Sequence, residues 1–97
     1  MKKAIQILLV DDHPLILEGL KGLLSSIPNT KVVASAGNGA DALALLKTNQ
    51  VDLAFLDINL PDINGMELCK KITQKYPDIK CITLSTFGER SYVSRMI

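Results

Sequence analysis

The 97-residue chain contains no tryptophan, and aromatic residues make up only 4% of it. A platform that stacks nucleic-acid bases needs several aromatic rings, so none is expected. Lysine and arginine number 11 against 10 aspartates and glutamates, which gives a net charge of +1. This balance lacks the basic excess by which a chain binds nucleic acid through bulk charge. The apolar share of 47% and the charged share of 22% are those of one globular domain, which excludes disorder and collagen-like repeats.

Cysteine is also scarce, and the chain holds only Cys69 and Cys81. They form no CxxC pair, and each lies within an apolar pattern. We therefore predict two reduced thiols that pack as small hydrophobic side chains, which favours a cytoplasmic location.

Long hydrophobic runs are missing as well. The start of the chain, Met1-Lys2-Lys3 and then Ala4–Val10, is similar to the start of a signal peptide. The apolar run is short, however, is interrupted by Gln6 and precedes no small-residue cleavage site. No run approaches the length that crosses a bilayer, so no membrane partner is expected.

Short apolar runs alternate with amphipathic ones along the whole chain. Strands are expected at Ile5–Val10, Lys31–Ala36, Asp52–Leu56 and Lys80–Leu84. Helices are expected from Pro14 to Ile27, at Ala40–Thr48, at Met66–Tyr76 and from Glu89 to Ile97. Strict alternation predicts right-handed parallel crossovers with helices on both faces of a sheet. The predicted fold class is α/β, a doubly wound open parallel sheet that binds ligands at the carboxyl ends of its strands.

Chemically active side chains follow three of these strands. The first strand ends at Asp11-Asp12, the third at Asp57 and the fourth at Ser85. Carboxylates gathered at one edge repel one another unless a cation is present, and hard oxygen ligands suit Mg²⁺. A carboxylate can also act as a nucleophile toward phosphorus and form an acyl phosphate.

Each of these residues also has a purely structural interpretation. Asp11-Asp12 could cap the helix that Pro14 opens, Asp57 could cap a loop, and Ser85 could be a turn hydroxyl. Their joint placement at three strand ends favours a functional site. His13 is the single histidine and is predicted to be a local capping or surface residue rather than a base or metal ligand.

Three segments of the chain resemble bacterial response-regulator receiver domains. The opening Leu8–Leu15 segment resembles their acidic pair and its surroundings, in the form found with LuxR-type helix-turn-helix output domains. The segment Leu56–Gly65 resembles their phosphorylation segment, and Thr83–Thr86 resembles the switch after their fourth strand. The resemblance covers the whole chain and implies a flavodoxin-like sheet with strand order 2-1-3-4.

The resemblance also implies a role for each matching position. Asp57 would be the phosphoacceptor, and Asp11 and Asp12 would hold Mg²⁺ together with Asp57. Asn59 would complete the metal site through its backbone carbonyl. Ser85 would contact the phosphoryl group and act as a switch. Pro61 and Gly65 would shape the loop after Asp57. The phosphate would come from a sensor histidine kinase.

The chain departs from the family at its C-terminal end. The family has a fifth strand that carries a lysine, an aromatic switch residue before it and a fifth helix, yet no lysine follows Ser85. Tyr92 falls in the predicted helix and does not replace the aromatic residue. Residues 1–97 are therefore expected to be a C-terminally incomplete receiver domain without its DNA-binding output domain, which in the parent protein would control transcription.

Two consequences are expected from this incompleteness. Phosphorylation should be slower without the lysine. The fourth strand should become an unpaired apolar edge, and the missing helix should uncover apolar surface beside the first helix. We therefore predict a homodimer or an oligomer that exchanges elements between chains.

Two further functional classes compete with a phosphoacceptor module that has no enzymatic turnover. Phosphatases that form an aspartyl phosphate need a second acid two residues after the nucleophile, and that position is Asn59. The alternative function is a receiver-like interaction module that no longer takes phosphate because the chain is incomplete.

Overall fold

The structure, a computed structural model, describes residues 4–84 and the backbone of residues 93–96. The elements in chain order are β1 (Ile5–Val10), α1 (Pro14–Ser25), β2 (Thr30–Ala36), α2 (Gly39–Leu46), β3 (Leu53–Asp57), α3 (Gly65–Lys75), β4 (Lys80–Leu84) and β5 (Val93–Met96). The first four strands are parallel and lie in the order β2-β1-β3-β4, which confirms the predicted order and fold class.

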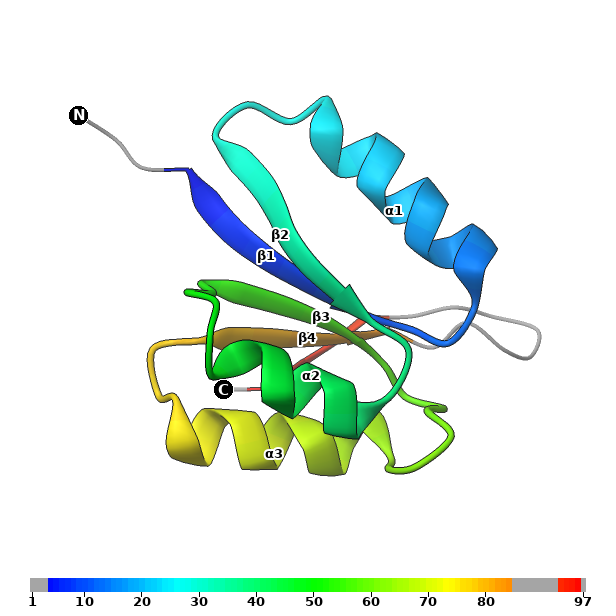
Figure 1. The fold of residues 1–97 in the computed structure, drawn as a ribbon, viewed down its shortest axis with the longest axis vertical. Helices are drawn as coiled ribbons and strands as arrows, with labels where there is room; N and C mark the ends of the chain where they lie inside the picture. The colour runs from blue at the N-terminus through cyan, green and yellow to red at the C-terminus, as the bar shows by residue number, and fades with distance from the viewer. Residues whose placement is uncertain (1–3, 85–92, 97) are drawn as a thin grey trace.

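The helices cover both faces of the sheet (Figure 1). Helix α1 lies on one face, and α2 and α3 lie together on the other. Successive side chains of strand β1 point to opposite faces of the sheet, and the helices on each face bury them. Ile7 and Leu9 pack with Leu24 of α1, whereas Leu8 and Val10 join the larger core beneath α2 and α3.

The two helices on that face begin at asparagine caps. The Asn38 side chain accepts a hydrogen bond from the Asp41 amide at 2.7 Å, and the Asn64 side chain accepts one from the Met66 amide at 2.7 Å. Each cap satisfies an N–H group that has no partner within the helix. Helices α2 and α3 therefore start one residue earlier than the sequence predicted.

The secondary structure predicted for the C-terminal residues is wrong at the positions that the structure describes. Val93–Met96 forms strand β5, which pairs antiparallel with β4, whereas a helix from Glu89 to Ile97 and an unpaired β4 edge were predicted. An isolated helix of about two turns is marginal in water. The edge of β4 instead offers a row of backbone partners, and pairing satisfies them. The edge of β4 therefore no longer supports the predicted oligomer.

Exposed apolar side chains lie on α1. Leu15 is 86% exposed and Leu23 is 68% exposed. Part of the surface of α1 is therefore apolar and exposed, and its uncovering by a missing helix stays a prediction. No helix in the described ranges combines the length and the apolar character that a bilayer crossing requires.

Cys69 of α3 and Cys81 of β4 are buried free thiols in the core. Burial raises the pKa of both thiols, and that of Cys81 by a large amount. Because the thiolate is the reactive form, we expect neither cysteine to react with Ellman's reagent in the native protein and both to react rapidly in denaturant. Fast labelling of the folded chain would show that the space between α3 and β4 opens readily.

Candidate functional site

Two parallel strands bring buried carboxylates to the same edge of the sheet. Asp57 is the last residue of β3, and Asp11 directly follows β1. The sheet ladder holds both positions, because the Asp11 amide donates to the Ala36 carbonyl at 3.0 Å and the Ile58 amide donates to the Leu84 carbonyl at 3.1 Å. Asp11 is 2% exposed and Asp57 is 1% exposed.

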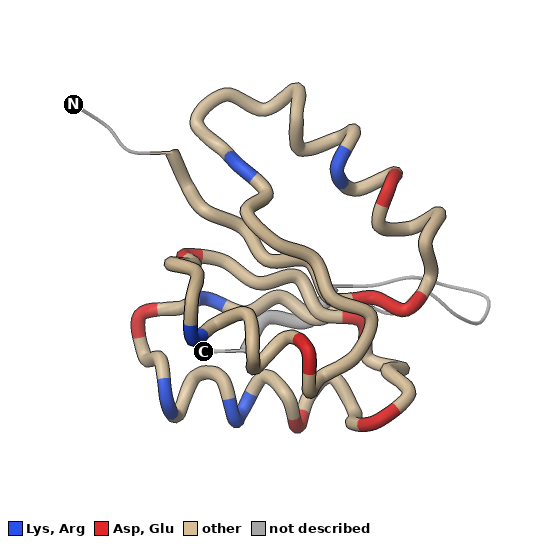
Figure 2. Tube along the Cα trace, in the orientation of Figure 1, with Lys and Arg blue, Asp and Glu red and all other residues tan. Residues whose placement is uncertain are grey.

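Acidic positions gather at this carboxyl edge, whereas the lysines lie mostly at the opposite edge and on the helices (Figure 2). Asp12 is the third acid of the cluster, and its side chain is 38% exposed. It therefore provides the solvent-facing side of the cluster, and Asp11 and Asp57 form its floor.

His13 lies among the three carboxylates. Its Nδ1 atom is 2.5 Å from Asp11 Oδ1, 3.1 Å from Asp12 Oδ1 and 3.7 Å from Asp57 Oδ2. The hydrogen bond to Asp11, together with the charges of the three acids, raises the pKa of His13. His13 was predicted to be a local capping or surface residue: it occupies the N-cap position of α1 and is partly exposed, but its side chain makes no cap hydrogen bond.

The cluster fits a hard divalent cation. One ligand atom from each of Asp11, Asp12, His13 and Asp57 can be chosen so that all lie within 4.8 Å of one another. Within the described part of the chain, Asp11 Oδ2 is buried and has no hydrogen-bond partner. A buried carboxylate oxygen is costly to leave unsatisfied, and Mg²⁺ prefers such oxygen ligands.

The loop after β3 folds back against the carboxylate of Asp57. The Asn59 amide donates to Asp57 Oδ1 at 3.3 Å, and Asn59 also forms an isolated bridge with Asn64. The Gly65 amide donates to the Ile58 carbonyl at 2.8 Å. A Cβ atom on Gly65 would lie 2.2 Å from the Asp57 carbonyl oxygen, so only glycine allows α3 to start this close to β3.

Asp62 ties this loop to α2. Its carboxylate accepts hydrogen bonds from the Gly39 amide at 2.8 Å and from the Ala40 amide at 2.9 Å. These two bonds lower the pKa of Asp62 below its ordinary value of 3.8. The loop that carries Asn59 is thus fastened at its middle to the first turn of a neighbouring helix.

We expect Asp62→Asn to lower the unfolding midpoint at neutral pH, because a neutral amide is a weaker acceptor at a helix N-terminus. The pKa of Asp62 is lowered in the folded state, so its contribution is complete above 3.8 and is lost as the pH falls through the folded pKa. Urea unfolding at a series of pH values should show the two proteins converging below pH 3.8. A constant difference across that range would contradict this account.

The structure brings Asp11, Asp12 and Asp57 together, and it places Asn59, Pro61 and Gly65 in or at the end of the adjoining loop. Ser85 lies outside the described residues. Sequence reasoning missed the positions of His13 and Asp62. For Asp62 the available signal was indirect. The Gly37-Asn38-Gly39 segment marks the start of a helix, and the first N–H groups of a helix need an acceptor, which Asp62 supplies.

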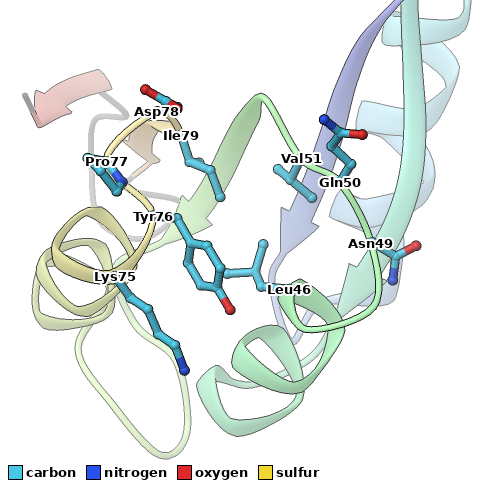
Figure 3. Close-up of a pocket in the computed structure, with 9 residues that line it drawn as sticks. All are labelled: Leu46, Asn49, Gln50, Val51, Lys75, Tyr76, Pro77, Asp78 and Ile79. Atoms are coloured by element: carbon cyan, nitrogen blue, oxygen red, sulfur yellow. The ribbon is translucent and has the colours of Figure 1, made fainter.

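A separate pocket of about 370 Å³ lies at the opposite end of the sheet, where α2 and α3 end. Figure 3 shows Tyr76 directed toward Leu46, with Lys75 at one side, and all three residues line the pocket. Its lining includes no member of the acidic cluster, so the two features are distinct.

Comparison with known proteins identifies one family. The sequence profile of the response regulator receiver domain matches residues 7–97. The chain is 39% identical over 93 residues to the transcriptional regulatory protein DegU of Brevibacillus brevis, covering 96% of this chain and 39% of DegU. It is 40% identical over 83 residues to the DNA-binding transcriptional activator DevR/DosR of Mycobacterium tuberculosis, covering 86% of this chain and 38% of that protein.

A solved structure shows the same fold. The signal receiver domain of the putative response regulator NarL from Mycobacterium tuberculosis aligns with a TM-score of 0.81 and 30% sequence identity, covering 91% of this chain and 71% of that one. The chain thus spans about two-fifths of the length of the two curated relatives described above.

Proposed function

This chain belongs to the response regulator receiver domain family, and we propose that Asp57 accepts a phosphoryl group from the phosphohistidine of a sensor kinase. The observation that carries the proposal is the placement of Asp57 at the end of β3, buried beside Asp11 and within reach of Asp12. Receiver domains are phosphoacceptor signalling modules rather than enzymes with turnover, and the acidic cluster supports that role here.

The proposed step is an in-line displacement at phosphorus. A carboxylate oxygen of Asp57 forms a bond to phosphorus as the bond to the histidine nitrogen breaks, and the leaving imidazole keeps the electron pair. Mg²⁺ held by Asp11, Asp12 and Asp57 would screen the negative charge of the phosphoryl group. The Asn59 amide already donates to Asp57 Oδ1 and orients the nucleophile, and its carbonyl is the further metal ligand that we propose.

The residues after β3 and β4 carry the remaining proposed roles. Ser85 would bond a phosphoryl oxygen and pull the loop after β4 inward, which is the switch. Pro61 and Gly65 would shape the loop that presents Asn59. For Gly65, its close approach to the Asp57 backbone supports that role.

We also propose a role and partners for the longer parent protein. Residues 1–97 would be the receiver portion of a cytoplasmic response regulator that controls transcription through a DNA-binding domain outside this chain. The similarity to DegU and DevR/DosR supports that proposal. The exposed leucines of α1 support the proposed self-association into a homodimer or exchanged oligomer. The alternative remains an interaction module that does not take phosphate.

Intact-mass measurement after incubation with acetyl phosphate and Mg²⁺ tests the function. We expect the wild type to gain the mass of one phosphoryl group and Asp57→Ala to gain none. Asp78→Ala, which removes an exposed aspartate from a loop, is the matched control and should behave like the wild type.

Failure of the folded wild type to gain mass would favour the interaction module. Steady release of inorganic phosphate from small phosphomonoesters would instead indicate a phosphatase.

A further inference from the structure

We propose that His13 is a fourth metal ligand of the acidic cluster and shifts its preference from Mg²⁺ toward Co²⁺ and Zn²⁺. This inference deepens the proposed function, on which it rests, because it concerns the cation held beside Asp57. The chain's sole imidazole would thereby decide which divalent ion accompanies phosphoryl transfer.

The position of the ring nitrogen is the first observation. His13 Nδ1 faces Asp11, Asp12 and Asp57 at 2.5, 3.1 and 3.7 Å, so it lies where those side chains converge. The His13 amide also donates to Asp11 Oδ1 at 2.8 Å, which fixes the backbone of the residue against the cluster. The ring is directed to this point although His13 is the N-cap residue of α1, a position whose side chain usually caps the helix.

The second observation concerns Asp11. The side chain is 2% exposed, and its Oδ2 atom has no hydrogen-bond partner in the part of the chain that the structure describes. One carboxylate oxygen of Asp11 is thus engaged by His13, while the other is buried and available to a cation. Binding of a cation would release the proton that Nδ1 shares with Asp11 Oδ1, because imidazole ligates metals only in its neutral form, and the nitrogen and this carboxylate would then belong to one ligand set.

The chemistry of that set determines the preference. Three carboxylates alone form a hard oxygen site, which suits Mg²⁺. Imidazole suits later first-row ions such as Zn²⁺ better, and in the same series the affinity of a nitrogen and oxygen site for Co²⁺ exceeds that for Mn²⁺. Removing the nitrogen should therefore weaken Co²⁺ binding while changing Mg²⁺ binding little.

Titration calorimetry on the metal-free chain measures this difference. Because imidazole binds metals as the neutral form, the titrations are made at about pH 8. We expect His13→Asn to lower Co²⁺ affinity by at least about tenfold, the lower end of the loss seen when groups that hydrogen-bond to metal ligands are removed, and to keep Mg²⁺ affinity within about twofold. Asn38→Ala, a change at the cap of α2, is the control and should leave both affinities unchanged.

Nuclear magnetic resonance of the wild type gives an answer that needs no variant. With a single histidine in the chain, one imidazole gives all the ring signals. Zn²⁺ should shift the Nδ1 resonance of His13 to the range of a metal-bound nitrogen, and Co²⁺ should shift the ring protons strongly. An Nδ1 resonance unchanged at saturating Zn²⁺ would overturn the proposal.

The outcomes separate this proposal from the function on which it rests. Equal Co²⁺ affinity in wild type and His13→Asn, with phosphorylation of Asp57 in Mg²⁺ intact, would refute the ligand role alone. Tighter binding of both metals by His13→Asn would refute it too and would show that the ring obstructs the site. A chain that binds neither metal and gains no phosphate would refute both.

Discussion

Replacing Gly65 with alanine is expected to destabilise the folded chain by about 3 kcal/mol, the upper end of what overpacking usually costs. The added Cβ atom would lie 2.2 Å from the Asp57 carbonyl oxygen and 2.8 Å from Ile58 Cα. Both obstacles are backbone atoms and cannot move aside as a flexible side chain would. The start of α3 must therefore shift away from β3, and the Asp57 carboxylate shifts with its backbone.

Urea unfolding followed by circular dichroism measures the loss. Gly22→Ala in α1 is the matched control, because a Cβ atom there meets no atom within 4 Å. That change should stabilise the chain by about 0.5–1 kcal/mol, since alanine loses less backbone entropy in a helix than glycine. A Gly65→Ala protein as stable as the wild type would contradict the close approach of α3 to Asp57.

Asp57→Asn is expected to stabilise the metal-free chain by about 1–3 kcal/mol. Asp11 and Asp57 are both almost completely buried, and their ligand atoms lie within 4.8 Å of each other. The substitution removes one negative charge from this pair and keeps an oxygen that can accept the hydrogen bond from Asn59. Relief of the repulsion raises the free energy of unfolding.

Adding Mg²⁺ should reverse the ranking. A cation that binds only the folded state stabilises it, and the wild type keeps all three carboxylates with which to bind it. Thermal unfolding with and without Mg²⁺ should show a rise for the wild type and little change for Asp57→Asn. Asp78→Asn, an exposed position, should follow the wild type in both conditions. An Asp57→Asn protein that is less stable without metal would show that Asp57 is held by contacts stronger than the repulsion.

The parts of the fold that follow from periodic sequence patterns were predictable. Alternating apolar and amphipathic runs indicated four parallel strands, and the rule for their carboxyl ends indicated that Asp11 and Asp57 meet. These inferences depend only on periodicity and handedness, which are local properties or general rules. The strand order β2-β1-β3-β4 was expected from the resemblance to receiver domains. The element bounds moved by one or two residues because side-chain caps such as Asn38 and Asn64 decide where a helix begins.

Features that depend on a distant partner were not predictable. The pairing of β5 with β4 is decided by an available edge, and Val93–Met96 alone does not reveal it. The bonds of Asp62 to the first turn of α2 join positions more than 20 residues apart. His13 was assigned a local role because its sequence neighbours suggest one, yet one of its nearest acids, Asp57, comes from another strand.

The most direct test of the account is to locate the phosphoryl group. After reaction with acetyl phosphate and Mg²⁺, borohydride reduces an aspartyl phosphate to an alcohol, and peptide mass spectrometry finds the altered residue. The account predicts reduction at Asp57 and at no other aspartate. Reduction at Asp11 or Asp12 instead would contradict it, because those residues would then be the acceptors rather than the ligands of the cation.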